Sequence, residues 1–318
     1  MGEKDMQEIG NEYHIPVLYE ETLDQLVWNP DGIYIDCTLG GGSHSEGILK
    51  RLSEKGRLIS IDQDANAIAF CKKRLEKYGK QWSVFQNNFE NIDIVSYLAG
   101  VDKVDGILMD IGVSSTQLDD GERGFSYRYD AKLDMRMNKE QDLSAYEVVN
   151  TYAEQDLVRI LFEYGEERHA KKIASFICEN RKEKPIETTG ELVAIIKRAY
   201  SERASKHPAK KTFQAIRIEV NRELEVLEKA IKKSVDLLKP KGHLAIITFH
   251  SLEDRLVKTV FKDLATACKC PPELPVCVCG GKAKVKILTK KPIIPSEDEL
   301  GKNNRAHSSK LRVVERLA

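Results

Sequence analysis

A short apolar run that ends in an acid and leads into three consecutive glycines constrains this chain more than any other feature. Residues 33–36 favour a β-strand, the glycines at 40–42 predict a turn without side chains, and residues 46–52 favour a helix. Such a turn lets a ligand approach the backbone, and the first turn of a helix offers unpaired N–H groups to polar ligand atoms. Residues 33–45 therefore predict a site for a nucleotide-like cofactor. The alternative is a tight turn without a ligand.

A second acid follows at the interval that such a site requires. Residues 57–61 favour a second strand, which ends in Asp62, 20 residues beyond Gly42. In nucleotide sites built from a strand, a helix and a strand, an acid at about this offset binds the ribose hydroxyls. We therefore predict that Asp62 is the ribose ligand.

The same pattern recurs at the ends of two further predicted strands. Residues 82–86 favour a third strand, closely followed by Phe89, and residues 104–109 favour a fourth, which ends in Asp110. Open parallel sheets bind ligands beyond the carboxyl ends of their strands. We therefore expect these side chains and those at the ends of the first two strands to meet at one edge of a sheet.

The alternation of strands and helices stops after the fourth strand and resumes near residue 243. Residues 128–203 contain only helical patterns, and a buried strand at 243–249 then ends in His250. Three more predicted elements, a long helix and two closing strands, lie at 213–238, 284–289 and 311–314. The fold class is therefore α/β, a Rossmann-like sheet interrupted by an inserted all-helical domain. The expected domains are the first part of the sheet domain, the helical insertion and the second part of the sheet domain, at residues 1–127, 128–212 and 213–318.

Composition limits the partners that this chain can have. Its 318 residues include 50 Lys and Arg against 50 Asp and Glu, so the net charge is zero. This balance excludes a uniformly basic nucleic-acid coat but allows a local basic patch. No stretch resembles a signal peptide or a membrane span, and seven cysteines, an odd number, suit a reducing compartment. We expect a cytoplasmic protein without membrane association.

The glycine turn distinguishes between two classes of cofactor. A nicotinamide dinucleotide site requires G-x-G-x-x-G, whose last glycine permits close packing of helix and strand. Ser45 occupies the position of that last glycine. Sites for S-adenosyl-L-methionine are less strict in glycine and carry an acid shortly before the turn, as Asp36 is placed here. The turn therefore favours S-adenosyl-L-methionine.

Six stretches, in order along the chain, carry a resemblance to one known family. The loop D-C-T-L-G-G-G-S-H-S from Asp36 is similar to the family's D-G-T-x-G-x-G-G-H-S, and D-G-I-L-M-D-I-G-V-S-S from Asp105 is similar to its second signature. The other four stretches lie at 122–126, 133–137, 207–211 and 247–254. Together they resemble the bacterial 16S ribosomal RNA cytosine-N4 methyltransferases, the RsmH (MraW) family, from about His14 to the C-terminus.

The resemblance implies a function and a set of site residues. It implies a class I methyltransferase that uses S-adenosyl-L-methionine to methylate the N4 amine of a cytosine near the decoding centre. The implied partner is small-subunit (16S) ribosomal RNA within an assembled or near-assembled 30S particle. The implied cofactor contacts are Gly42, Ser43, His44, Asp62, Phe89, Asp110 and Gln117.

Two residues of the loop depart from the family pattern, because Cys37 and Ser43 stand where glycine is usual. A serine keeps its backbone N–H, so we expect cofactor binding to survive unless position 43 needs a positive φ. We expect Cys37 to be tolerated because it lies at the end of a strand.

Asp110 is the candidate catalytic residue. Cytosine N4 is a poor nucleophile because its lone pair is delocalised into the ring, so an acceptor for the amine protons would take up the developing charge. Asp110 lies where amino methyltransferases generally place such a group, but residues 111–113 lack their usual proline pair and aromatic residue. Asp110 is therefore either catalytic or only a cofactor ligand. Nearby, Phe125, Tyr127 and Tyr129 either stack on a base or pack a loop.

A local excess of basic residues predicts where RNA would bind. Residues 197–222 hold eight Lys and Arg against two acids, which predicts a phosphate track rather than a solvated helical face. A second basic rim is expected from Lys290, Lys291, Arg305, His307, Lys310 and Arg312. The helical insertion would recognise the substrate, or else form the interface of a homodimer.

Two further features leave alternatives open. Four thiols, Cys268, Cys270, Cys277 and Cys279, could bind zinc, but their C-x-C-x6-C-x-C spacing is unusual and we assign no metal. His250 would contact base or phosphate, or else only precede a capping box of Ser251 and Asp254.

Two other functions compete with the rRNA methyltransferase. The first is a methyltransferase for a DNA amine or a small-molecule amine. The second is a non-catalytic RNA-binding factor for ribosome assembly.

Overall fold

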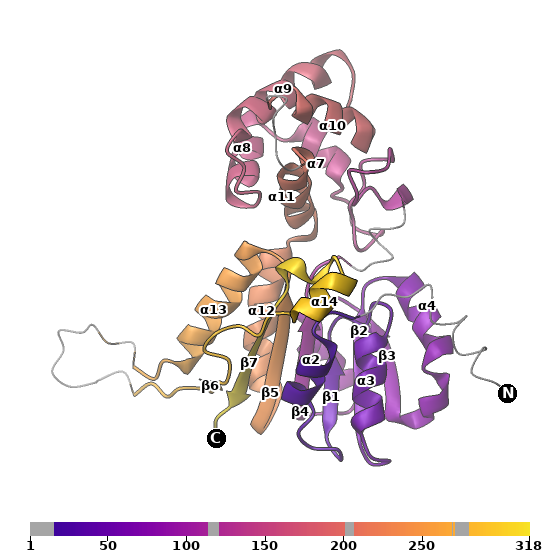
Figure 1. Cartoon of the computed structure of the whole chain (residues 1–318), viewed down its shortest axis with the longest axis vertical. Coiled ribbons are helices and arrows are strands. Elements are labelled where there is room, and N and C mark those ends of the chain that lie inside the picture. Colours follow the sequence, from indigo (N-terminus) through magenta and orange to yellow (C-terminus); the bar gives the residue numbers. More distant parts are fainter. Residues whose placement is uncertain (1–15, 114–120, 201–206, 269, 271–279) are drawn as a thin grey trace. The chain divides into compact units, whose positions relative to one another are not determined.

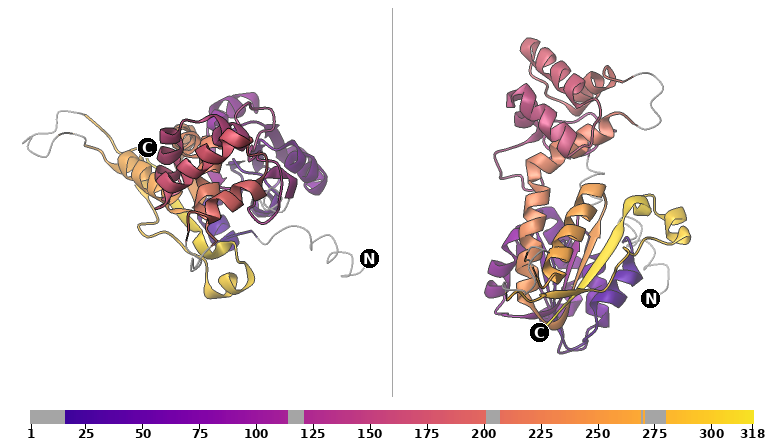
Figure 2. Two further views of the ribbon diagram at one scale, coloured as in Figure 1. Left: turned by 90° about the horizontal axis from the view of Figure 1, so that it is seen from above. Right: turned by 90° about the vertical axis from the view of Figure 1, so that its left-hand side faces the viewer.

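A computed structural model describes residues 16–113, 121–200, 207–268, 270 and 280–318. The chain forms two compact units (Figures 1 and 2). The first comprises Met1–Gly112 and Leu224–Ala318, and the second comprises Val113–Glu223. Within the described residues, no helix is both long enough and apolar enough to cross a membrane.

The first unit is built on a seven-stranded sheet of the described residues, in the order β3-β2-β1-β4-β5-β7-β6. Strands β1 to β5 run parallel, and β7 runs antiparallel to both of its neighbours. The strands, from β1 to β7, are Ile33–Asp36, Arg57–Asp62, Trp82–Gln86, Val104–Asp110, Leu238–Thr248, Val285–Ile287 and Lys310–Arg316. The predicted Rossmann-like α/β sheet is confirmed.

Helices cover both faces of this sheet (Figure 1). Strand β4 is buried at every residue before Asp110, as expected for a parallel strand covered on both faces. One apolar cluster joins the sheet to α2 (Tyr19–Leu26), α3 (Ser43–Arg51) and α4 (Ala65–Arg74). A second cluster, on the other face, joins it to α5, α12 and α13, which span Ile92–Leu98, Glu223–Leu237 and Ser251–Ala265. The short helix α14 spans Glu297–Lys302.

The second unit is helical and has an apolar core of its own. Its helices α7 to α11 are Ala145–Thr151, Glu154–Glu163, Ala170–Glu183, Thr189–Lys197 and Ala209–Asn221. Capping boxes at Ser144 and Thr188 begin α7 and α10. The unit extends beyond residues 128–212 at both ends, because Phe125 and Ile216 belong to the helical core and not to the core of the sheet.

The prediction of one long helix over residues 213–238 is wrong. The helix α11 ends at Asn221 and α12 begins at Glu223, because Arg222 between them adopts a left-handed conformation with φ 51°. Tertiary hydrogen bonds fix this break, since the Asn221 side chain donates to the Met135 carbonyl and accepts from the Met137 N–H. Left-handed residues end helices and are usually glycine, so an arginine at this point gave no signal.

Candidate active site

The candidate site lies where the strand order of the sheet reverses. From β1 the chain passes to β2 on one side, and β4 pairs with the other side of β1. Asp36 ends β1 and Asp110 ends β4, so both acids lie at the carboxyl edge of this switch point. In open α/β sheets this is the place where ligands bind.

The glycine loop has the backbone geometry that requires glycine. Gly40 and Gly42 adopt φ of 49° and 78°, and Gly42 is the N-cap of α3. A Cβ added at Gly42 would lie 2.8 Å from the sulfur of Cys71, so the loop is closely packed from behind. Ser43 is the first residue of α3 and has no positive φ, so a serine fits where the family has glycine.

Asp36 is fully buried, and its carboxylate is used within the loop. It accepts hydrogen bonds from the Thr38 N–H (3.0 Å) and the Ser45 hydroxyl (2.6 Å). Burial raises the pKa of Asp36, and these two hydrogen bonds oppose that increase. Asp36 therefore positions the loop and α3. Ser45 has a structural role at the position where a dinucleotide site has glycine.

Asp62 binds the loop from the end of β2. Its two oxygens accept hydrogen bonds from the N–H groups of Gly40 and Asp64, each at 2.8 Å. Desolvation raises the pKa of Asp62 to about 6, although both hydrogen bonds favour the charged form. Each carboxylate oxygen has a second lone pair, so Asp62 can still accept from ribose hydroxyls.

The buried His44 pairs with the partly exposed Asp110 at the switch point. The Nδ1 of His44 lies 3.4 Å from Oδ2 of Asp110, and the histidine is only 6% exposed. Burial lowers the pKa of His44, but its hydrogen bond to Asp110 and the charges of Asp110 and Asp36 outweigh this and leave the pKa raised. Asp110 is tied to the loop as well, because its N–H donates to the Thr38 hydroxyl at 2.8 Å.

Each member of this pair also has a buried atom without a hydrogen-bond partner among the described residues. These atoms are Nε2 of His44 and Oδ1 of Asp110. A buried polar atom left unsatisfied costs about 1–3 kcal/mol, so native proteins keep few of them. The backbone of Val17 also acts on His44, so Oδ1 of Asp110, beside a glycine loop and a helix N-terminus, is the atom that best fits a polar ligand.

The structure places Phe89 outside this cluster and does not describe Gln117. Phe89 begins the short 3-10 helix Phe89–Asn91 after β3, and it packs, half-buried, against the core on one face of the sheet. Gln117 lies outside the described residues, so its contact stays a prediction.

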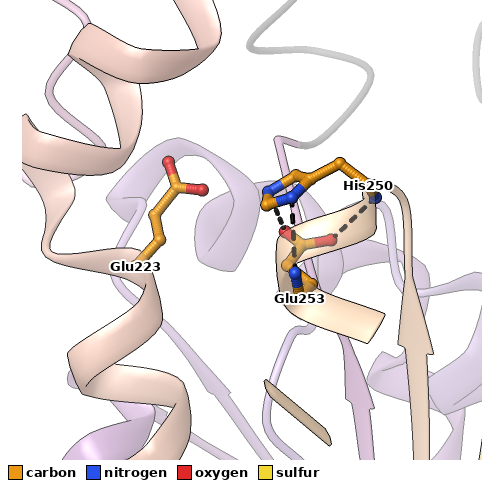
Figure 3. A group of neighbouring side chains, drawn as sticks. All are labelled: Glu223, His250 and Glu253. Atoms are coloured by element: carbon orange, nitrogen blue, oxygen red, sulfur yellow. Dashed lines mark hydrogen bonds and ion pairs between the residues drawn. The ribbon is translucent and has the colours of Figure 1, made fainter. Parts of the chain in front are cut away.

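The capping box predicted from Ser251 and Asp254 is wrong, because His250 itself caps α13. Glu253 completes the box: its carboxylate accepts from the N–H of Phe249 (2.7 Å) and of His250 (3.2 Å). The ring of His250 lies against this buried carboxylate, with Nε2 2.9 Å from Oε1 (Figure 3). This contact orients His250 toward its own helix and gives it a structural role.

Two other acids also have structural partners, each within its own unit. Asp254 forms ion pairs with Arg312 (2.6 Å) and Lys310 (3.0 Å). Glu223, the third residue drawn in Figure 3, belongs to the helical unit, where its carboxylate accepts from Arg217 at 2.8 and 2.9 Å. Arg217 is therefore a neutralised member of the predicted basic track.

The three candidate stacking aromatics have different environments within the helical unit. Phe125 is buried in its core. Tyr127 stacks on His207 with 4.3 Å between ring centroids, and Tyr129 is 51% exposed. Phe125 therefore has a packing role, because it is buried. Of the three, only Tyr129 has a large exposed surface.

The remaining sequence candidates are only partly described. Lys197 and Lys210 of the basic track are exposed, while residues 201–206 lie outside the described residues. Cys277 and Cys279 also lie outside them, so zinc binding by the four thiols is not tested. Sequence reasoning missed Thr38 and Ser60, whose hydroxyls link the loop to β4 and β2. No spacing rule marks such small polar residues.

The sequence matches the MraW methylase family over residues 11–317. The chain belongs to the MraW methylase family. The predicted family is therefore confirmed, and so is the methyltransferase class of the predicted sheet.

Relatives of this MraW-family chain match it along nearly its whole length. The protein named ribosomal RNA small subunit methyltransferase H from Fusobacterium nucleatum is 74% identical over 312 residues, 98% of this chain and 99% of that protein. Proteins of the same name from Clostridium botulinum and Lachnospira eligens are 58% and 55% identical. Each covers 96% of this chain, and the matches span 99% and 98% of those proteins.

Solved structures resemble the chain only loosely. An rRNA methylase from Streptococcus thermophilus has a TM-score of 0.41 at 12% identity, with 94% of each chain covered. An S-adenosylmethionine-dependent O-methyltransferase from Thermotoga maritima has a TM-score of 0.43 at 8% identity, covering 99% of this chain and 70% of that one. Likeness at this level carries no conclusion about the activity of this chain.

Proposed function

We propose that this MraW-family chain transfers a methyl group from S-adenosyl-L-methionine to the N4 amine of a cytosine in 16S ribosomal RNA. The target would lie near the decoding centre of an assembled or near-assembled 30S particle. The name shared by the relatives, which cover nearly the whole chain, supports the RNA substrate. The observation that carries the chemistry is the pair of His44 and Asp110, with the unsatisfied Oδ1 of Asp110 beside a glycine loop.

The loop and the strand ends would hold the cofactor. The backbone N–H of Ser43 at the start of α3 suits its polar end, and His44 would add a side-chain contact. The N–H of Gly42 donates to the Leu39 carbonyl at 2.7 Å, so Gly42 would contribute by bringing the backbone close to the cofactor. Asp62 would accept from the ribose, Phe89 would lie by the adenine, and Gln117 would add a further contact. When bound, the cofactor supplies an electrophilic methyl group on a sulfonium.

Asp110 would act on the nucleophile. Its Oδ1 can accept a hydrogen bond from the amine, which favours a localised nitrogen lone pair and takes up developing positive charge. His44 holds Oδ2 and so fixes the orientation of Oδ1. The pair therefore fixes the orientation of an acceptor before the reaction, which reduces the reorganisation that the reaction requires.

The site of methylation tests this proposal. Protein and labelled methyl donor are incubated with free 16S RNA, assembled small subunits and cytosine-containing DNA, and each product is digested to nucleosides. We expect label in N4-methylcytidine from RNA or the particle. Label in another nucleoside, or only in DNA, would exclude the proposed reaction.

Asp110→Asn separates catalysis from cofactor binding. If Asp110 accepts the amine proton or charge, kcat should fall about 100-fold or more, while cofactor affinity changes less than about tenfold. A loss of cofactor affinity of similar size, with little change in kcat at saturating cofactor, would show that Asp110 is only a cofactor ligand.

The competing functions have weaker support. No described feature favours a DNA or small-molecule amine, and membership in a methylase family argues against a purely non-catalytic assembly factor. We propose that the helical insertion recognises RNA and that the protein acts in the cytoplasm, where its proposed substrate is made. Light scattering of the purified protein would show whether it is a homodimer.

A further inference from the structure

A groove of the first unit lies away from the candidate active site. It has a volume of about 580 Å³ and runs between α13 and the edge strand β6. Strand β6 is three strands beyond β4 in the sheet, about 14 Å at ordinary strand spacing. The groove therefore belongs to a surface distinct from the one that carries Asp110.

The rim of this groove is basic. Lys258 and Lys262 lie one turn apart on α13, and Lys286 and Lys290 lie on and just after β6. All four are exposed, and none forms an ion pair with a described residue. The lining contains no acidic side chain, so a protein of zero net charge concentrates positive charge here.

The floor of the groove is apolar. It is formed by Phe261, Ala265, Val285, Ile287 and Leu317. Thr289, the polar uncharged side chain of the lining, is buried and donates to and accepts from Val313. The fifth cation, Arg312, is held by Asp254. The floor therefore offers no free group that could read the edge of a base.

We propose that this groove binds a single-stranded segment of the RNA substrate, with phosphates on its four lysines and base or ribose faces on its floor. The inference rests on the proposed RNA substrate. Charged walls around an apolar floor suit a polyanion with flat apolar faces, and such binding tolerates any sequence. An acidic protein segment is the competing occupant, and it lacks the independent support that the relatives' names give to RNA.

Oligonucleotide binding tests the groove without the methylation reaction. The probe is a fluorescein-labelled oligouridine of about 12 nucleotides, within the range one binding module covers. Its Kd is measured by anisotropy over a salt series for the full-length wild type, Lys258→Gln/Lys262→Gln and Lys286→Gln/Lys290→Gln. The control is Lys55→Gln/Lys80→Gln, which removes two exposed lysines that have no ion pair with a described residue and lie before β2 and β3.

We expect each groove variant to raise Kd about fivefold or more and to reduce the salt slope by about 1.4, while the control stays at wild type. An oligocytidine should show the same changes. Groove variants that match the control would overturn the proposal. A groove variant that keeps oligouridine binding but loses labelled polyglutamate would also overturn it, in favour of a protein partner.

Methylation kinetics distinguish failure of the groove from failure of the proposed function. With 16S RNA or particles as substrate, the groove variants should raise KM for RNA severalfold and leave kcat unchanged. A wild type that forms no N4-methylcytidine refutes the proposed function, and the oligouridine arm still decides the groove. A wild type that methylates while the groove variants keep its KM and Kd refutes only the groove.

Discussion

Single residues of the glycine loop decide how closely a ligand can approach the backbone. Gly42 combines a positive φ with close contact to Cys71, whereas Ser43, the next residue, lies in a helix and needs neither property. Ser45 and Asp36 hold the loop from within the core. The departure from the family pattern at Ser43 therefore falls on a position that does not require glycine.

Single substitutions of Gly42 and Ser43 test whether only the first of these positions requires glycine. Gly42→Ala should lower the free energy of unfolding by about 1–3 kcal/mol, because alanine at this φ is strained and its Cβ meets the Cys71 sulfur. Ser43→Gly should cost no more than about 1 kcal/mol and leave cofactor affinity within about twofold. Urea denaturation and titration calorimetry measure both quantities, and equal effects of the two substitutions would contradict this account.

Asp62 predicts a pH dependence for cofactor binding. Its pKa of about 6, against an ordinary 3.8, means that the folded protein binds this proton more tightly than the unfolded chain. The stability that Asp62 contributes is therefore present at low pH and is lost as pH rises through about 6. Accepting ribose hydroxyls requires the charged form, so cofactor affinity should rise over the same window.

Calorimetry at two pH values checks this expectation. Cofactor affinity should be about tenfold weaker at pH 5 than at pH 7.5, because about one tenth of the carboxyl groups are then charged. Asp62→Asn should bind weakly at both pH values. A wild-type affinity that does not change with pH would show that Asp62 is not the ribose acceptor.

Element boundaries in this chain depend on contacts that local propensity does not reveal. A histidine, His250, caps the start of α13, and Glu253 accepts from the N–H groups of both His250 and Phe249. Asp254, which sequence reasoning took as the capping acid, pairs instead with Arg312 of β7. The α11–α12 break at Arg222 likewise depends on the tertiary bonds of Asn221.

The cap of α13 can be tested with neighbouring substitutions. Glu253→Ala should cost about 1–3 kcal/mol, because it leaves the buried start of the helix without its carboxylate acceptor. Ser251→Ala, at an exposed residue, should change stability by no more than about 0.5 kcal/mol. Thermal or urea unfolding of both variants gives the comparison. A larger loss of stability for Ser251→Ala than for Glu253→Ala would instead support the predicted capping box of Ser251 and Asp254.

At the scale of the whole molecule, the helical unit and the sheet unit have separate apolar cores, and the core of the sheet unit consists of two clusters. The helical unit has its own core, and both tryptophans of the chain, Trp28 and Trp82, lie in the sheet unit. Tryptophan fluorescence therefore reports on the sheet unit, while far-UV circular dichroism reports on the helices of both units. The proposed cofactor residues that are described all lie in the sheet unit.

Denaturant unfolding followed by tryptophan fluorescence and by far-UV circular dichroism should show that the two units unfold separately. We expect the two denaturant transitions not to coincide, and cofactor to shift the fluorescence transition more than the dichroism transition. At a ligand concentration of 100 times Kd, the sheet unit should gain about 2.7 kcal/mol. Coincident transitions with and without cofactor would mean that the two units unfold together.

The sequence by itself determined the first four strands, the glycine loop and the acids at the strand ends. Glycine turns and apolar runs are local signals, so the chain displays them without its fold. Motif order along the chain similarly identified the family. The residue types that carry the proposed chemistry, Asp62 and Asp110 among them, were predicted in the same way.

Only the tertiary structure decided how these residues are used. Asp36 turned inward to hold the loop, His44 paired with Asp110, and His250 took the cap of its own helix. The groove between α13 and β6 likewise brings lysines of two distant segments to one surface. The His44–Asp110 pair and the groove join segments that are far apart in the sequence, and such long-range contacts leave no periodic pattern in the chain. The contacts of Asp36 and His250 are local, but several nearby side chains could have made them and only the fold selects among these.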